Sequence, residues 1–420
     1  MAEQHGKTLV PQIRFAGFTD PWEQRKLGEL YQKNDERNTD GLGSERTLSV
    51  ASMTFNSAGN GADDSSLPNY KRLRLGDIAF EGHTNKEFAY GRFVLNDAGN
   101  GIMSPRFTCL RPIVEQEYSF WKYFIHSEKV MRPILVNSTK SGTMMNELVV
   151  EDFLKQEILV PSLPEQRRIG AFFDRLDSLI TLHQRKYDKL CVLKKSMLDK
   201  MFPKGGSLYP EIRFAGFTDP WEQRKLSSTC EQLSRTINPL ETPNEEFTEY
   251  SMPAFDNNET AETVIGNSMN SLRKIVDRPC LLVNKLNVRK KRIWHVPRPE
   301  ANAVCSSEFV PFSSHSSDLS FIKISLLSER ITAYLESCSS GSSNSQKRVT
   351  PEIIMSSEII APSLAEQRRI GAFFDRLDSL ITLHQRKYDG CANPLFLERR
   401  ISCRKPSHQN RCSATTTPSG

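Results

Sequence analysis

The densest group of side chains suited to binding chemistry is a run of cations in residues 284–298. This run, NKLNVRKKRIWHVPR, has no acidic residue, and its cations are Lys285, Arg289, Lys290, Lys291, Arg292 and Arg298. Such cations neutralise nucleic-acid phosphates and can donate to the edge of a guanine, and an asparagine such as Asn287 can bind the edge of an adenine. The run predicts a DNA contact made by Asn287 and by the cations from Lys285 to Arg292. A solvated loop between two strands accounts for the same charges equally well.

In the first half of the chain the cations are dispersed, and a loop of small residues is the favoured site. Lys140 and Ser141 lie in the segment STKSG (138–142), and a longer Ser-rich loop (337–345) closes the second half. We predict DNA contacts at Lys140, Ser141 and Arg106. The other dispersed cations are Lys71, Arg72, Arg74, Arg92 and Arg111.

Motifs for catalysis or for a resident cofactor are missing from the sequence. It has no GxxxxGK[ST] loop for ATP, no GxGxxG after a strand, no Asn/Asp-Pro-Pro-aromatic motif of an amino-methyltransferase, and no HExxH or CxxC pair for zinc. Cys391, Cys403, His408 and Cys412 lack a standard ligand spacing. We therefore expect no catalytic residue, no metal and no cofactor in this chain.

Composition is that of a globular protein with a mild excess of positive charge. The chain has 420 residues, 38% of them hydrophobic, and a formal net charge of +6. This length allows two or more domains with cores of their own. No apolar run reaches the roughly 18 residues of a membrane helix, and the first residues have no apolar signal core, so we expect a cytoplasmic protein without a membrane partner.

Two segments occur twice in identical form and divide the chain into tandem halves. IRFAGFTDPWEQRKL stands at 13–27 and at 212–226, and EQRRIGAFFDRLDSLITLHQRKYD stands at 165–188 and at 366–389. The stretches between them, roughly 31–150 and 227–350, are dissimilar. A duplicated frame with two variable bodies follows from this pattern, because the period is too long for a solenoid repeat.

The second repeated segment predicts a long helix with an apolar seam. Ser162 with Glu165, and Ser363 with Glu366, form capping boxes at its two starts. Apolar residues then recur in alternating steps of three and four, as in a coiled coil, and the first helix is expected to end near Phe202. A spacer or dimerising helix without a role in DNA reading is the alternative. The residues predicted to pair the helices are Ile169, Phe172, Leu176, Leu179, Ile370, Phe373, Leu377 and Leu380.

The first repeated segment and the variable bodies predict a mixed α/β fold. Phe15, Phe18 and Trp22 are expected to pack onto a neighbouring surface before a short helix over 23–27. We expect helices over 117–131 and 321–334, and the expected strands lie at 78–80, 102–112, 157–160, 280–286, 292–296, 304–305, 309–310 and 358–361. The fold class is thus α/β (α+β), with two variable domains joined by long helices in a pseudo-twofold tandem repeat.

The repeated PSLxEQRRIGAFFDRLDSLITLHQRKYD helix, with FAGFTDPWEQRKL, GDIAF and NKLNVRKKRIW, resembles the specificity subunit of type I restriction–modification enzymes over residues 1–389. The resemblance implies that each variable body is a target recognition domain for one half of a split, asymmetric DNA site. It implies that the two helices form an antiparallel coiled coil that sets the gap between the two halves of the DNA site. It also implies that these helices dock two modification subunits. Those partners would use S-adenosylmethionine to methylate adenine, and restriction subunits would use ATP and Mg²⁺ to translocate and cleave DNA.

One departure from the repeat follows Asp389. The first copy continues as KLCVLKKSMLDKMFP, whereas the second continues as GCANPLFLERR and loses the apolar seam. A frameshift after Asp389 is our hypothesis, and a standalone DNA-binding regulator or an inactive specificity subunit is the alternative function. The expected organisation is a first recognition domain (1–160), a central helix (161–204), a second recognition domain (205–361), a shortened second helix (362–389) and a disordered tail (390–420).

Overall fold

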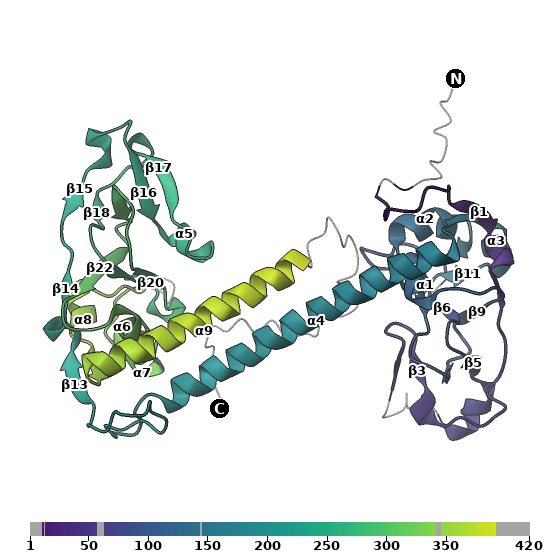
Figure 1. The fold of residues 1–420 in the computed structure, drawn as a ribbon, viewed down its shortest axis with the longest axis horizontal. Coiled ribbons are helices and arrows are strands. Elements are labelled where there is room, and N and C mark those ends of the chain that lie inside the picture. Colours follow the sequence, from purple (N-terminus) through teal and green to yellow (C-terminus); the bar gives the residue numbers. More distant parts are fainter. Residues whose placement is uncertain (1–10, 12, 57–62, 143–144, 342–345, 392–420) are drawn as a thin grey trace. The chain divides into compact units, whose positions relative to one another are not determined.

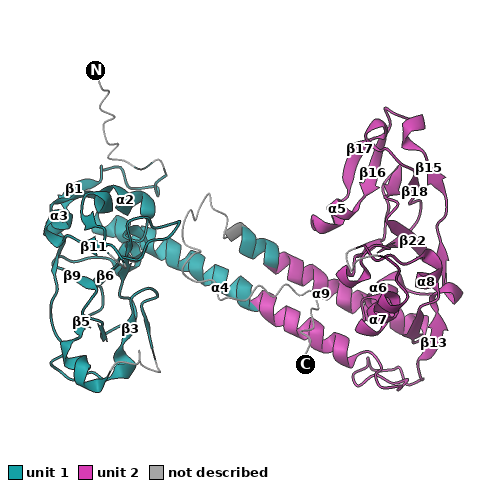
Figure 2. Ribbon diagram, turned by 180° about the vertical axis from the view of Figure 1, so that it is seen from behind, with its two compact units in different colours: residues 1–185, 385–420 teal, residues 186–384 magenta. Residues whose placement is uncertain are grey.

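The computed structural model describes residues 11, 13–56, 63–142, 145–341 and 346–391. By their internal contacts the residues form two compact units, which are treated separately below (Figure 2). Unit 1 is Met1–Arg185 with Gln385–Gly420, and unit 2 is Lys186–His384. The two variable bodies therefore fall in different units.

The centre of unit 1 is a four-stranded antiparallel sheet with the strand order β2-β9-β6-β7 (Figure 1). Ile78 pairs with Leu110, and Phe80 pairs with Phe93. These four side chains are at most 3% exposed, so the sheet forms one wall of the core. The turn predicted before β6 is confirmed at Gly76, whose φ of 87° suits glycine. The strands are β2 (Tyr31–Lys33), β6 (Ile78–Glu81), β7 (Arg92–Leu95) and β9 (Thr108–Pro112).

Smaller sheets complete unit 1. The single strand predicted over 102–112 is wrong in one respect, because a turn in which the Phe107 amide donates to the Ser104 carbonyl at 3.3 Å separates β8 from β9. β8 pairs with β5, and Met103 lies in a separate small core with Leu48 and Leu73. The strands are β3 (Leu48–Ser49), β4 (Thr54–Phe55), β5 (Lys71–Leu73), β8 (Gly101–Met103), β10 (Thr139–Lys140) and β11 (Glu147–Leu148), and the 3-10 helices are η1 (Leu27–Glu29), η2 (Ser44–Arg46) and η3 (Asp64–Asn69).

Unit 2 repeats the four-stranded sheet with the order β14-β22-β19-β20 and adds a five-stranded sheet, β15-β18-β21-β16-β17. The strands predicted at 280–286, 292–296, 304–305 and 309–310 are confirmed as β19, β20, β21 and β22. The strands are β14 (Cys230–Gln232), β15 (Thr236–Ile237), β16 (Glu246–Tyr250), β17 (Glu262–Ile265), β18 (Arg273–Ile275), β19 (Cys280–Asn284), β20 (Ile293–Val296), β21 (Ala303–Cys305) and β22 (Phe309–Ser314), and the 3-10 helices are η4 (Leu226–Ser228), η5 (Pro239–Glu241), η6 (Gly266–Ser268) and η7 (Val288–Lys290).

Each helix predicted at the end of a variable body is broken into two helices. The breaks fall at Ser127 and Ser328, which are the N-cap residues of α2 and α7. Serine is a preferred residue at the N-cap of a helix, and the Ser328 hydroxyl accepts from the Ile331 amide at 3.4 Å. The helices are α1 (Tyr118–Phe124), α2 (Glu128–Val136), α3 (Val150–Lys155), α5 (Met252–Asp256), α6 (Leu319–Leu326), α7 (Glu329–Ser337) and α8 (Pro351–Met355).

The short helix predicted over 23–27 is wrong, because most of this segment is a strand. β1 (Glu23–Lys26) pairs antiparallel with β12 (Glu157–Val160), and β13 (Glu222–Lys225) pairs in the same way with β23 (Glu358–Ala361). The strands predicted at 157–160 and 358–361 are confirmed. Tertiary pairing with a strand more than one hundred residues away overrides the helix-forming tendency of EQRK.

The two copies of the repeated helix are α4 (Leu163–Lys200) and α9 (Leu364–Cys391). The end predicted near Phe202 is confirmed within the uncertainty of a helix terminus. Within unit 2 the last turns of α4 run antiparallel to the first turns of α9, because Lys194 bonds to Asp378 and Phe202 contacts Phe374. No helix in the described part of the chain is both long and apolar enough to cross a membrane.

Candidate nucleic-acid interface

In unit 2 the predicted basic loop packs against the end of the Ser-rich segment. The loop (285–292) joins β19 to β20. The Asn287 amide donates to the Lys347 carbonyl at 2.9 Å, and the Val349 amide donates to the Lys285 carbonyl at 3.0 Å. Residues 285–292 and 346–349 therefore lie side by side, and we call them loop pair 2. Part of the predicted Ser-rich loop (342–345) lies outside the described residues.

Unit 1 has the corresponding arrangement. The loop 82–91 joins β6 to β7, which occupy the places of β19 and β20 in the sheet, and it packs against the β10–β11 hairpin. The Asn146 amide donates to the Gly82 carbonyl at 2.9 Å. A Cβ at Gly82 would lie 1.9 Å from the Asn146 carbonyl oxygen, so only glycine allows this approach. Residues 82–91 with the described residues of 139–148 form loop pair 1. Lys140 and Ser141 thus lie at the place that the Ser-rich segment takes in unit 2, beside the loop 82–91, which matches the basic loop.

Three cations of the basic loop are already held by acids from other elements. Arg289 pairs with Glu336, Lys291 pairs with Glu329 at 2.6 Å and donates to the Leu327 carbonyl at 3.0 Å, and Arg292 makes two bonds to Asp256 at 2.8 and 2.5 Å. Hydrogen bonding to Arg292 holds the pKa of Asp256 below its ordinary value, and Arg289 does the same for Glu336. These cations position the loop as well as adding to its charge.

Apart from Arg348, the remaining cations of loop pair 2 form no ion pair with any described residue. These are Lys285, Lys290 and Lys347, and the last was not singled out from the sequence because it lies 57 positions beyond Lys290. Arg348 is held by Glu308 at 2.7 Å. Asn287 adopts φ 52°, which is left-handed, and its half-buried side-chain amide bonds to no other described residue. The side chains of this loop pair that can still donate hydrogen bonds to a ligand are therefore Lys285, Asn287, Lys290 and Lys347.

In unit 1 the structure separates the predicted site residues. Lys140 and Ser141 are exposed on the hairpin, and Lys140 forms no ion pair with a described residue. Arg106 lies in the turn between β8 and β9 with its guanidinium 4.8 Å from the Phe107 ring centre, outside loop pair 1. The exposed Lys86, which the sequence did not single out, belongs to loop pair 1.

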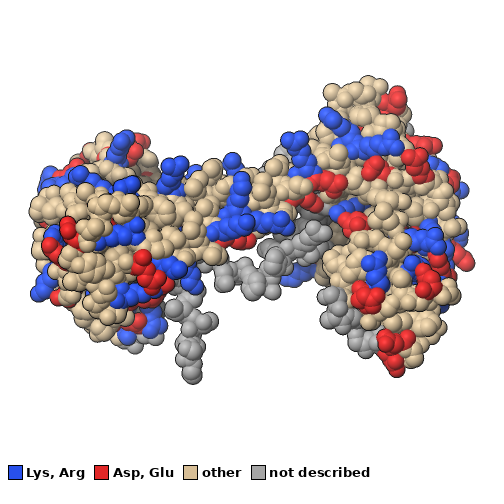
Figure 3. Space-filling view, turned by 60° about the horizontal axis from the view of Figure 1, so that its bottom comes forward, with Lys and Arg blue, Asp and Glu red and all other residues tan. Residues whose placement is uncertain are grey.

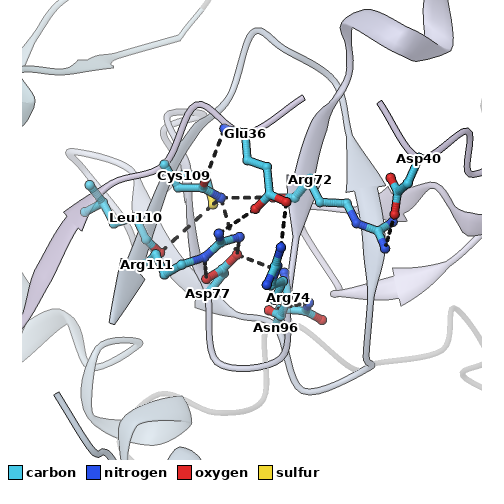
Figure 4. A network of polar contacts seen from close by, with 10 residues as sticks. Glu36, Asp40, Arg72, Arg74, Asp77, Asn96, Cys109, Leu110 and Arg111 are labelled. Atoms are coloured by element: carbon cyan, nitrogen blue, oxygen red, sulfur yellow. Dashed lines mark hydrogen bonds and ion pairs between the residues drawn. The ribbon is translucent and has the colours of Figure 1, made fainter. Parts of the chain in front are cut away.

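The other dispersed cations of unit 1 are tied into polar networks. Arg111 donates to Asp77 at 3.0 and 2.9 Å and to Glu36 at 2.5 Å, and Arg74 also donates to Glu36 (Figure 4). Hydrogen bonding to Asp77 raises the pKa of Arg111, and hydrogen bonding to Arg111 lowers the pKa of Glu36. Lys71, Arg72 and Arg92 pair with Asp35, Asp40 and Glu81 in the same way. On the face that Figure 3 shows, positive side chains are interspersed with acidic ones over both units.

The repeated frame is built twice with the same contacts. Gln166 accepts from the Glu117 amide at 3.3 Å and donates to the Pro161 carbonyl at 3.0 Å, and Gln367 makes the matching bonds to residues 318 and 362 at 3.1 and 2.9 Å. For the predicted capping boxes, the serine bond is confirmed in the second copy, but the glutamate bond is wrong in both. Ser363 accepts from the Glu366 amide at 3.4 Å, but the carboxylates of Glu165 and Glu366 bind Arg14 and Arg213.

The predicted helix-pairing residues differ in exposure between the two copies. On α9, Ile370 and Leu377 are 1% and 5% exposed, and Phe373 and Leu380 are half-buried. On α4, Ile169 and Leu176 are half-buried, and Phe172 and Leu179 are 41% and 38% exposed. Cys403, His408 and Cys412, which lack a zinc-ligand spacing in the sequence, lie outside the described residues, and so does the side chain of Cys391.

Two α/β units on a duplicated frame, each with a cation-bearing loop pair at the same place, define a tandem nucleic-acid-binding protein. The model of the type I restriction modification DNA specificity domain matches residues 19–191 and again 219–390. The chain therefore belongs to this family and, with two such domains, is a specificity subunit of a type I restriction–modification system. No curated protein matches the sequence.

Two solved structures are similar over most of their length. The HsdS subunit from Thermoanaerobacter tengcongensis shares 18% identity, with 88% of this chain and 93% of that chain covered and a TM-score of 0.44. The S subunit of a type I restriction–modification system from M. genitalium shares 14% identity, with coverage of 91% and 96% and a TM-score of 0.48.

Proposed function

We propose that the two loop pairs read the two halves of a bipartite, asymmetric DNA site, and that the chain itself is not catalytic. The observation that carries the proposal is the contrast between an identical frame and two dissimilar loop pairs. Loop pair 2 offers Lys285, Asn287, Lys290 and Lys347, whereas loop pair 1 offers Lys86, Lys140 and Ser141. Different side chains at equivalent places recognise different bases, so the two half-sites differ.

The long helices α4 and α9 set the distance between the half-sites in this proposal. They form an antiparallel coiled coil, as the alternating three-and-four spacing of their apolar residues favours. A rigid spacer fixes the number of base pairs between two half-sites. Because the frame occurs twice, it offers two equivalent surfaces, and we propose that each docks one modification subunit.

The chemistry belongs to the partners of the subunit. Modification subunits use S-adenosylmethionine to methylate adenine, and restriction subunits use ATP and Mg²⁺ to translocate and cleave DNA. The residues of this chain bind and orient the DNA in the cytoplasm, where these partners act.

Methylation mapping tests the proposal. The gene is expressed with a modification-subunit gene from the same genome in a host without adenine methylation, and methylated adenines are mapped by single-molecule sequencing. We expect one new split motif that disappears without this chain. A chain with loop 285–292 replaced by the 82–91 loop should alter one half of the motif only. A motif that is unchanged by this replacement excludes loop pair 2 as a reader.

The altered sequence after Asp389 favours a second candidate, an inactive subunit. Sequencing the coding DNA and translating the other two frames tests the frameshift hypothesis, which fails if neither frame continues the KLxxLKKSML pattern. No new methylated motif, combined with retained DNA binding and failure to bind the modification subunit, supports the inactive subunit. Specific DNA binding without neighbouring modification genes supports a standalone regulator.

A further inference from the structure

Identical helix sequences in the two units are buried to different degrees. Ile370, Phe374 and Leu377 of α9 are 1%, 0% and 5% exposed. Their counterparts on α4, Ile169, Phe173 and Leu176, are only half-buried. Since the 24 residues from Glu165 to Asp188 equal those from Glu366 to Asp389, the difference comes from what packs against them.

In unit 2 the buried face of α9 is covered by the C-terminal end of α4 and by the residues that follow it. Met201 belongs to the same buried cluster as Phe374 and Leu377, and Leu190, Met197 and Phe202 pack against that cluster. The Phe202 ring lies 5.7 Å from Trp221, 5.8 Å from Phe321 and 6.4 Å from Phe374 between ring centres. Lys194 adds an ion pair to Asp378 at 2.5 Å. Residues 189–203 thus form an amphipathic cap with apolar residues on one side and lysines beside them.

We call the surface that the cap covers in unit 2 the seat; it includes Trp221, Phe321 and Phe374. Unit 1 has matching residues. Trp22, Phe120 and Phe173 stand at the positions of Trp221, Phe321 and Phe374, and Asp177 stands at the position of Asp378. Trp22 is half-buried, whereas Trp221 is 1% exposed. The Phe124 ring, at the position of Ser325, lies 6.0 Å from the Trp22 ring between ring centres. Phe172 and Leu179 are 41% and 38% exposed.

The chain lacks a second copy of the cap. Twofold repetition would place it directly after Asp389, where GCANPLFLERRISC replaces KLCVLKKSMLDKMF. Leucine, methionine and phenylalanine at the positions equivalent to Leu190, Met197 and Phe202 become cysteine, glutamate and cysteine. The seat in unit 1 therefore has no matching segment in its own sequence.

We infer that the face of α4 formed by Ile169, Phe172, Phe173, Leu176 and Leu179 is a docking site for a cationic amphipathic helix of the type formed by residues 189–203, supplied by another polypeptide. The seat in unit 2 shows which chemistry fits: leucine and methionine along the seam, a terminal Met-Phe pair beside the tryptophan, and a lysine beside the aspartate. Burial of these apolar side chains drives the docking, because removing apolar surface from water is favourable and offsets the costs of association. This site binds a protein helix and is separate from the DNA-reading loops.

A peptide-binding experiment with the full chain tests this inference. The probe is a synthetic peptide of residues 186–203 with Cys191→Ser and an N-terminal fluorophore, and its anisotropy is followed as the full chain is added. We expect saturable binding with one peptide per chain. Leu176→Gln should weaken it at least about tenfold. Leu182→Gln, on the same helix but off this face, should leave it unchanged, and a peptide with Met197→Gln and Phe202→Ser should not bind.

Three results would overturn the inference. They are absence of saturable binding, equal binding by Leu176→Gln, and a dimer of the chain alone that Leu176→Gln dissociates in sedimentation, which would make a second copy the occupant. Circular dichroism shows whether Leu176→Gln is folded, and Phe172→Ser, at an exposed position, serves as the second variant. The assay contains no DNA, so its outcome is independent of the proposed DNA reading.

Discussion

Arg14 donates two parallel hydrogen bonds to Glu165, from Nε to Oε1 at 2.6 Å and from Nη2 to Oε2 at 2.7 Å. Glu165 is fully buried in the first turn of α4, and Arg14 comes from the N-terminal arm. Arg213 and Glu366 repeat this geometry in unit 2, with both bonds at 2.7 Å. The bidentate pair therefore ties the arm to the start of the long helix in each copy of the frame.

Glu165→Gln should release the arm from α4. A neutral amide offers one acceptor and no charge, so one guanidinium bond is lost and the other weakens. We expect the melting temperature of unit 1 to fall by about 5 °C and hydrogen exchange to increase in residues 13–27. Glu366→Gln should act in the same way on 212–226, and Glu23→Gln, at an exposed position, serves as control. Unchanged exchange in both arms would show that the pair does not hold them.

Arg111 is expected to matter for stability rather than for DNA binding. Asp77 is 1% exposed and takes two bonds from Arg111, so Arg111→Ala leaves a buried carboxylate with reduced compensation. We expect a loss of about 3 kcal/mol in the free energy of unfolding measured with urea. Arg106→Ala, which removes no ion pair with a described residue, should change it by less than about 0.5 kcal/mol. Equal effects of the two variants contradict the assignment.

Gly82→Ala should disturb loop pair 1 without unfolding the sheet. The new Cβ would lie 1.9 Å from the Asn146 carbonyl oxygen, so the β10–β11 hairpin with Lys140 must move away. We expect DNA affinity to fall about tenfold, measured by anisotropy with the methylation-mapped duplex. Gly43→Ala is the control, because its φ of −73° is ordinary and its close neighbour is the flexible Glu45 side chain. An unchanged affinity for Gly82→Ala would remove this hairpin from the interface.

The cations without ion pairs among the described residues should carry the phosphate contacts. Lys285→Ala, Lys290→Ala and Lys140→Ala should each lower the slope of log affinity against log salt by about one. Arg292→Ala should leave the slope nearly unchanged and lower stability, because Arg292 is 10% exposed and held by Asp256. DNA titrations at four salt concentrations separate the two groups. A slope change with Arg292→Ala, but none with the lysine variants, reverses the assignment.

The sequence predicted the parts of the fold that local patterns encode. The closing strands Glu157–Val160 and Glu358–Ala361, the start of each long helix and the end of α4 follow from alternation, capping and breaking residues. β1 could not be predicted in this way, because EQRK becomes a strand only through pairing with β12. The role of Glu165 was missed for the same reason, since Arg14 lies 151 positions away in the sequence.

The sequence located the basic run but not the neighbours of its cations, and the DNA contacts of this run stay a prediction. The run 284–298 contains no acid, and on this basis the sequence predicted DNA contacts for five of its cations, yet Arg289, Lys291 and Arg292 pair with Glu336, Glu329 and Asp256. Conversely, Lys347 joins the site only because two loops from different parts of the body share backbone bonds. A charge count along the chain reports composition, whereas the number of cations available to DNA depends on tertiary neighbours.

A half-buried histidine, His295, should make the stability of unit 2 depend on pH. His295 lies 3.3 Å from the Ser320 hydroxyl, which donates to Asp375 at 2.6 Å, so the histidine Nδ1–H must be the donor in this contact. Burial lowers the pKa of His295 below its ordinary value of 6.5, and Lys323 adds to this effect while Asp375 and Asp318 oppose it. As pH falls through 6.5, the unfolded chain takes up a proton that the folded unit resists. The contribution of His295 to the stability of unit 2 is therefore fully present above pH 6.5 and declines below it.

Urea midpoints of unit 2 at pH 7.5, 6.5 and 5.5 check this dependence. His295→Gln keeps a hydrogen-bond donor near Ser320 but cannot titrate, so its midpoint should decline less than that of the natural chain between pH 7.5 and pH 5.5. His315→Gln, at an exposed position, should follow the natural chain. Parallel curves for His295→Gln and the natural chain would mean that other groups account for the pH dependence. His295 lies on β20, which begins where the basic loop ends, and Ser320 connects it to Asp375 on α9, so this titration acts on the sheet that carries the basic loop.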